Sequence, residues 1–176
     1  MYIKICLSVG QIGEAEKALH ELDRYDTGKK FVHHRRATIL AKKGSLDSAL
    51  REAEIAFDSG RGTFEAHCQK IDILIELGRY TEIEAELESL KRRFGNIRRD
   101  IQTGLRCKLY IRQGDWRRAQ AVWDSLDDKN SEINNVMMRQ ILVRKSEDPS
   151  LSITERQSVR DEIALLDPDL RDLSGL

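Results

Sequence analysis

The sequence has almost no proline and no long apolar run. Only Pro149 and Pro168 interrupt 176 residues, of which 34% are charged, and this composition suits a mostly helical protein. No apolar stretch approaches the roughly 18 residues that a helix needs to span a bilayer. Together with a mean hydropathy of −0.53, this argues against a membrane protein.

Cysteine is also scarce. Cys6, Cys68 and Cys107 form an odd, scattered set without the paired spacing of a disulfide framework. The first residues, 1–7, are too short for the apolar region of a signal peptide and have no basic leader before them. We therefore expect a reducing compartment and a cytoplasmic protein.

The motifs of common enzymes are missing. The sequence has no Walker loop, no dinucleotide-binding glycine pattern, no HExxH and no GxSxG, so we expect neither catalysis nor a cofactor. The best metal candidate pairs His33-His34 with His67-Cys68, 34 residues apart. Neighbouring residues point about 100° apart on a helix, so the four side chains do not readily converge, and we expect no metal site.

One short pattern occurs four times. Each copy has glycine, a large apolar residue two positions later, and alanine or isoleucine five positions later. The copies start at Gly10, Gly44, Gly78 and Gly114, at spacings of 34, 34 and 36 residues. A period of this length is typical of stacked helix-turn-helix pairs.

Apolar residues recur at helical spacing on both sides of each glycine. They predict helices over residues 2–9, 12–23, 30–43, 46–58, 63–77, 80–94, 97–113 and 116–126. The same spacing predicts a ninth helix over 131–145, and the capping box Ser152–Glu155 opens a tenth. We expect an all-α fold.

Residues 1–126 resemble the tetratricopeptide-repeat (TPR) family. Gly78-Tyr80 and Gly114-Trp116-Ala119 match its glycine–aromatic–alanine turn best. Two family positions depart from the pattern: an aromatic residue is replaced by His33, His67 and Thr103, and a leucine by Arg36, Lys70 and Arg106. The resemblance implies a right-handed α-solenoid of about four TPR-like pairs.

We divide the chain at residue 126. Residues 1–126 form the repeat array, in which the first repeat is incomplete. Residues 127–176 form a degenerate fifth repeat or C-terminal helical cap with a tail, of the kind that repeat arrays use at their ends. The incomplete first repeat suggests that the N-terminal end contacts another domain or a second copy of the chain.

In TPR arrays the first helix of each pair lines the concave surface that takes the ligand. The resemblance therefore implies a non-catalytic adaptor or scaffold that binds a protein segment there or through the ends of the solenoid, with Phe31, Ile101 and Leu105 as apolar anchors in the groove. The side chains expected on this surface are Phe31, His34, Arg35, Thr38, Lys42, Glu65, Cys68, Gln69, Asp72, Glu76, Ile101, Leu105, Lys108 and Arg112.

Charges offer alternatives to this interpretation. On the first helices their sign alternates between adjacent repeats, which fits either a ladder of ion pairs or a surface for a mixed-charge segment. A basic block over 91–118, which includes Arg92, Arg93, Arg98 and Arg99, would suit nucleic acid. No exposed aromatic series accompanies it, and this argues against base stacking. A third hypothesis is a regulatory segment of a larger enzyme.

Overall fold

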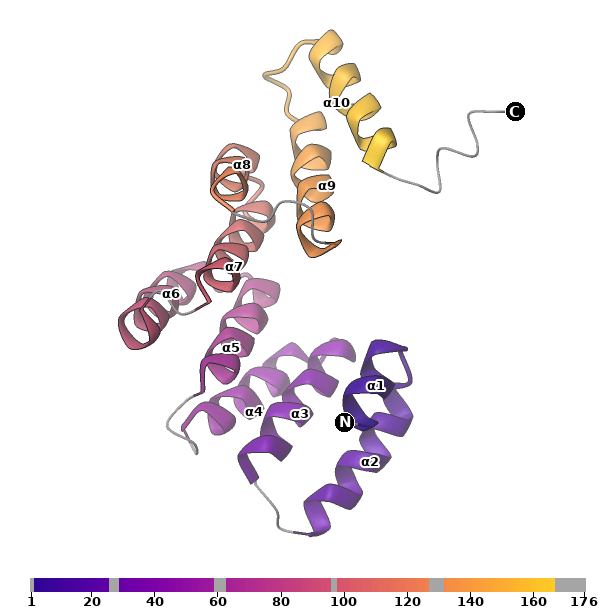
Figure 1. The fold of residues 1–176 in the computed structure, drawn as a ribbon, viewed down its shortest axis with the longest axis vertical. Coiled ribbons are helices and arrows are strands. Elements are labelled where there is room, and N and C mark those ends of the chain that lie inside the picture. Colours follow the sequence, from indigo (N-terminus) through magenta and orange to yellow (C-terminus); the bar gives the residue numbers. More distant parts are fainter. Residues whose placement is uncertain (1, 26–28, 59–62, 96–97, 127–131, 167–176) are drawn as a thin grey trace, which may run out of the picture. The chain divides into compact units, whose positions relative to one another are not determined.

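The computed structural model is all-helical over the residues that it describes, which are 2–25, 29–58, 63–95, 98–126 and 132–166. The helices are α1 (Tyr2–Ser8), α2 (Ile12–Arg24), α3 (Lys29–Lys42), α4 (Leu46–Asp58), α5 (Phe64–Leu77), α6 (Tyr80–Phe94), α7 (Arg99–Arg112), α8 (Trp116–Asp124), α9 (Glu132–Ser146) and α10 (Ile153–Leu166). Figure 1 shows them in order along the chain. The all-α prediction is confirmed, and the predicted helices match these bounds within about two residues.

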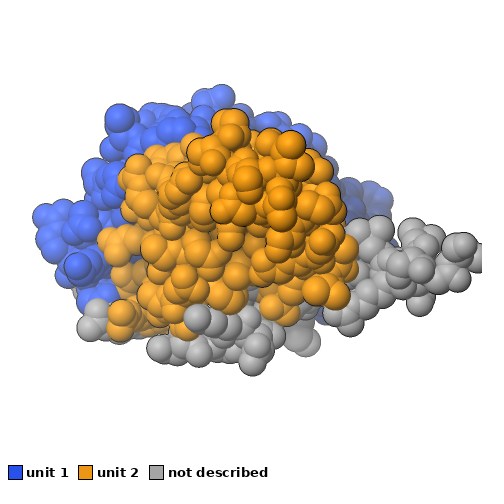
Figure 2. All heavy atoms as spheres, turned by 90° about the horizontal axis from the view of Figure 1, so that it is seen from above, with its two compact units in different colours: residues 1–97 blue, residues 98–176 orange. Residues whose placement is uncertain are grey.

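The helices belong to two compact units, residues 1–97 and 98–176 (Figure 2). In unit 1, α1 packs on α2, α3 on α4 and α5 on α6, and α2 also contacts α3 as α4 contacts α5. In unit 2, α7 packs on α8, α8 on α9, and α9 on α10. The division expected at residue 126 stays a prediction, and the tail over 167–176 lies outside the described residues.

The four repeated glycines close four similar turns. Gly10, Gly44, Gly78 and Gly114 have φ values of 76°, 77°, 71° and 75°, the left-handed region that favours glycine. In each turn the amide of the next residue donates to the carbonyl five positions earlier, as in Ser45 N to Leu40 O at 2.9 Å. This is a Schellman motif, which ends the first helix and starts the second.

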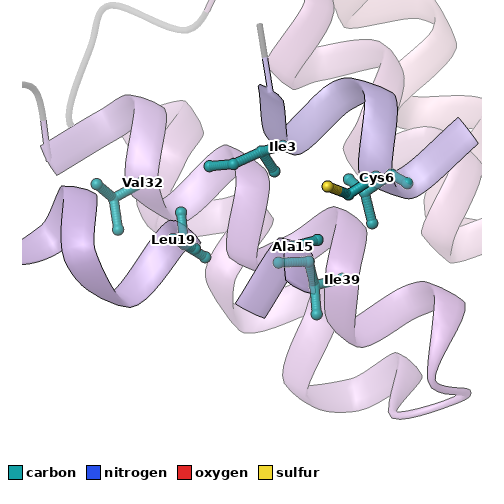
Figure 3. Packing of buried hydrophobic residues seen from close by; sticks show 7 residues of the cluster. Ile3, Cys6, Ala15, Leu19, Val32 and Ile39 are labelled. Atoms are coloured by element: carbon teal, nitrogen blue, oxygen red, sulfur yellow. The ribbon is translucent and has the colours of Figure 1, made fainter. Parts of the chain in front are cut away.

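The residue five positions after each glycine is fully buried. Ala15, Ala49, Ile83 and Ala119 are 0% exposed, so the second helix of each pair approaches the first closely. Figure 3 shows how α1, α2 and α3 share one apolar cluster, in which Ile3 and Cys6 face Ala15, Leu19, Val32 and Ile39. Apolar burial of this kind is the main stabilising term of each pair.

Unit 2 has its own apolar cluster. Cys107 and Ile111 of α7, Ala119 of α8 and Ile141 of α9 form its centre. Aromatic and sulfur-containing side chains surround this centre, among them Trp116, Trp123, Tyr110, Met137 and Met138. The helix predicted after residue 126 therefore packs on the pair before it.

Candidate functional site

One side of α3 carries a stripe of partly exposed side chains. Phe31, Arg35, Thr38 and Lys42 follow the spacing i, i+4, i+7 and i+11, so they lie on the same side of the helix. Residues at the corresponding places of α5 continue this surface. We call the described members the first-helix face: Phe31, His34, Arg35, Thr38, Lys42, Glu65, Cys68, Gln69, Asp72 and Glu76.

Gln69 joins the two helices of this face. Its Nε2 donates to the backbone oxygen of His34 at 3.1 Å and to Oγ1 of Thr38 at 2.8 Å. Both bonds run from α5 to α3, and they fix the side chains of one helix relative to those of the other. The structure thus brings together, on one surface, predicted site residues that are 31 to 35 positions apart in sequence.

An exposed aromatic ring and a cation lie at one end of the face. Phe31 is 42% exposed, and the guanidinium carbon of Arg35 lies 4.8 Å from the centroid of its ring. This distance is within the range of a cation–π interaction. The pair offers a partner an apolar surface with a positive edge.

Three polar atoms of the face are shielded from water yet have no hydrogen-bond partner of good geometry. They are Nδ1 of His34, Nε of Arg35 and Oε1 of Gln69. A shielded polar atom without a partner costs about 1–3 kcal/mol, and a ligand reaches such an atom only after the side chains that cover it move.

Burial lowers the pKa of His34, and the neighbouring Arg35 lowers it further. Gln69 and Glu65 act in the opposite direction but do not outweigh burial. His34 is therefore neutral near pH 7 and has one donor and one acceptor nitrogen on its ring.

A second polar cluster lies between α5 and α6. His67 is 0% exposed, and its Nε2 lies 2.7 Å from Oε2 of Glu86. Lys70 donates to the other oxygen of Glu86 at 2.7 Å. The imidazole packs 4.9 Å from the ring of Phe57 and 6.3 Å from that of Phe94.

The same arrangement occurs one repeat earlier. Nδ1 of His33 lies 2.6 Å from Oε2 of Glu52, and a nitrogen of Arg36 lies 3.6 Å from the same oxygen. His33 and Arg36 are the residues that depart from the family pattern. Their shared partner, Glu52, was not predicted. The sequence pattern could have indicated it, because a glutamate stands 19 residues after each of the two histidines, in repeats that are 34 residues apart.

The α7 residues of the expected surface belong to unit 2. Ile101 is 37% exposed, and Lys108 and Arg112 take part in interactions of their own. Leu105 was expected as an exposed anchor, but the structure buries it to 8% exposure. Leu105 and Leu109 stand one turn apart, on the side of α7 opposite Cys107 and Ile111, and the structure buries residues on both sides of this helix.

The basic block is divided between the two units. Arg92 and Arg93 end α6 in unit 1, whereas Arg98 and Arg99 begin α7 in unit 2. The guanidinium of Arg93 lies over the rings of Phe57 and Phe94, at 5.3 and 5.6 Å. Arg93 therefore packs against the aromatic surroundings of His67.

A hollow of about 600 Å³ lies in unit 2, where the turns before α8 and after α9 meet. Nε1 of Trp116 donates to Oδ2 of Asp148 at 2.7 Å, and Arg117 forms an ion pair of 2.9 Å with the same oxygen. The backbone N–H of Ser150 donates to the other carboxylate oxygen at 2.8 Å. The side-chain hydroxyl of Ser150 and then the bonds from Trp116 and the Ser150 backbone hold the pKa of Asp148 well below its usual range, and these contacts join the two turns.

Within the described part of the chain, no three His, Cys, Asp or Glu side chains cluster as metal ligands would. None of the described helices is long and apolar enough to cross a membrane.

Comparison with protein-family models, curated proteins and solved structures finds no match to this chain.

Proposed function

We propose that the chain is a non-catalytic protein-binding module that holds a segment of a partner protein against the first-helix face of unit 1. One observation carries the proposal: the exposed ring of Phe31, with the guanidinium of Arg35 over it, lies at one end of a face whose two helices are joined by Gln69. An extended segment would lay an apolar side chain on this ring and place its polar groups against the partly exposed side chains of the face.

The proposal includes the architecture suggested by the repeats. Four helix pairs of the TPR type would stack as a right-handed solenoid, with α9 and α10 as a C-terminal cap. The four equivalent Schellman turns and the 34-residue recurrence of the histidine–glutamate pair support this assignment. In such an array, first helices of successive pairs form one continuous binding surface.

Peptide selection with matched variants tests the binding face. A library of displayed peptides is selected against the full chain, and the selected peptides are then measured on Phe31→Ser and Ile55→Ser. Phe31 and Ile55 are similarly exposed, at 42% and 44%, but Ile55 lies on the second helix α4. We expect Phe31→Ser to weaken binding about tenfold or more, as for an aromatic anchor, and Ile55→Ser to leave it unchanged.

Two results would count against this function. Selected peptides that bind equally well to both variants would place the site elsewhere on the chain. Material captured from a cell extract only when nucleic acid is intact, and lost after nuclease treatment, would favour the basic block around Arg92 and Arg93 instead.

A further inference from the structure

Helix α3 lies in a segment without a single carboxylate. Residues 29–43 contain six lysines and arginines and no aspartate or glutamate. A helix with charges of one sign depends on neighbouring helices, or on a ligand, for compensation.

Neighbouring helices compensate part of this charge. A guanidinium nitrogen of Arg36 lies 2.7 Å from Oδ2 of Asp23 in α2, and Nζ of Lys43 lies 2.7 Å from Oε1 of Glu16 in α2. Arg35 and Lys42 form no ion pair with the residues that the structure describes. Among the four α3-segment cations whose side chains the structure describes, Arg35, Arg36, Lys42 and Lys43, the two without an ion pair are the two that belong to the first-helix face.

The spacing of these cations is defined by the helix. Arg35 and Lys42 are seven residues apart, so they lie on the same side of α3 with about 10 Å of rise between them. Phe31 lies about 6 Å before Arg35 along the same stripe. The face therefore presents, in order, an apolar ring, a cation and a second cation.

Resting on the function proposed above, we infer that the segment bound along α3 is acidic, with two carboxylates three residues apart in a polyproline II conformation and an apolar residue beside them. A polyproline II chain has three residues per turn and a rise of about 3.1 Å, so residues i and i+3 share a side and lie about 9 Å apart. This distance matches the separation of Arg35 and Lys42. The apolar residue would pack on Phe31.

A nucleic acid fits this face less well. Its phosphates repeat without interruption, whereas the neighbouring helix α5 contributes Glu65, Asp72 and Glu76 to the same surface. These carboxylates repel a polyanion that crosses them. An acidic peptide places its charges only along α3 and can turn neutral side chains toward α5.

The probe is a fluorescein-labelled, end-blocked peptide, Gly-Leu-Ser-Asp-Pro-Pro-Asp-Ser-Leu-Gly. Its prolines favour polyproline II, and its two leucines allow either chain direction along α3. One control peptide has asparagine in place of both aspartates. A second, Gly-Leu-Ser-Pro-Asp-Asp-Pro-Ser-Leu-Gly, has the same composition with adjacent carboxylates.

Fluorescence polarisation on the full chain measures binding. We expect the probe to bind at least about fivefold more tightly than either control, because each control loses one or both charge pairs. Arg35→Gln and Lys42→Gln should each weaken probe binding about two- to fivefold. Arg51→Gln makes the same charge change on α4 and should have no effect.

The outcomes separate this inference from the function on which it rests. If the probe binds no better than its controls, or not at all, while Phe31-dependent peptides without acidic residues emerge from the library, the inference fails and the binding function stands. If no peptide depends on Phe31, both fail. Displacement of the probe by a 20-nucleotide oligouridylate that binds more tightly and needs Arg35 would overturn the inference in favour of nucleic acid.

Discussion

The imidazole of His67 and the carboxylate of Glu86 form a 2.7 Å hydrogen bond between the two helices of one pair, and the histidine is fully buried. A polar link between helices is directional, so it fixes their register more closely than apolar contact alone.

We expect Glu86→Ala to lower the free energy of unfolding by about 2–3 kcal/mol, because it leaves buried His67 without its acceptor and Lys70 with only the longer ion pair to Glu54. Urea unfolding followed by circular dichroism measures this. Glu84→Ala on the same helix removes an exposed carboxylate and should change stability by less than about 0.5 kcal/mol. Equal effects of the two variants would show that the histidine–glutamate bond contributes little.

The pKa of His67 predicts that unit 1 loses stability in mild acid. Burial lowers this pKa, as do Lys70 and Arg93, and the hydrogen bond and charge of Glu86 only partly oppose them. The unfolded chain therefore takes up a proton near pH 6.5, before the folded chain does. The resulting stability is complete above pH 6.5 and is lost as the pH falls from there toward the lower, folded-state pKa, by at most about 1.4 kcal/mol per pH unit.

Urea unfolding at pH 7.5, 6.5 and 5.5 tests this dependence. His67→Phe has no titratable group at this position and should show a shallower loss between pH 6.5 and 5.5. His34 also has a lowered pKa, so part of the slope should remain in His67→Phe and disappear only in the double variant with His34→Gln. An unchanged slope in both variants would contradict the prediction.

Substitution by alanine should change the stability of the chain differently at two of its glycines. Gly78 has a φ of 71°, so Gly78→Ala should cost about 1–2 kcal/mol of stability, although there is space for a methyl group. Gly104 lies inside α7, and a Cβ there would meet Cε of Met137 at 3.9 Å, an ordinary contact. Gly104→Ala should therefore be neutral or stabilising by up to about 1 kcal/mol, and thermal unfolding of both variants checks the difference in sign.

The three cysteines should differ in reactivity. Burial raises the pKa of Cys107 to about 11, and Cys6 is 2% exposed, whereas Cys68 is partly exposed. Because the thiolate is the reactive form, we expect one thiol, that of Cys68, to react rapidly with an aromatic disulfide reagent at pH 8. The other two should react only as the chain unfolds, and a Cys68→Ser variant should lack the rapid phase.

The helices and their turns could be predicted from the sequence because both depend on local patterns. Apolar residues at helical spacing placed the ten helices, and the φ values of the four repeated glycines confirm why glycine stands there. These patterns concern a residue and its neighbours within one helix. They need no knowledge of what the helix packs against.

Features that depend on two helices were harder to predict. The bond from His67 to Glu86 joins residues on different helices, and a helical pattern of charges does not show which pairs meet. Leu105 was expected in the groove because of its repeat position, yet it is buried like Leu109, on the side of α7 opposite the core residues Cys107 and Ile111. The sequence also gives no sign of the boundary between the two units at residue 97, because the repeat pattern continues past that residue.

The shared spacing of the histidine–glutamate pairs has a consequence for how the chain can change in length. Deleting residues 45–78 would join Gly44 to Arg79, reproduce the glycine turn, and leave His33 nineteen residues before Glu86, the interval that now separates His33 from Glu52. A first helix from one pair would then meet the second helix of the next with a complete polar link. The spacing of these two pairs is therefore compatible with a change in repeat number by duplication or deletion in steps of 34 residues.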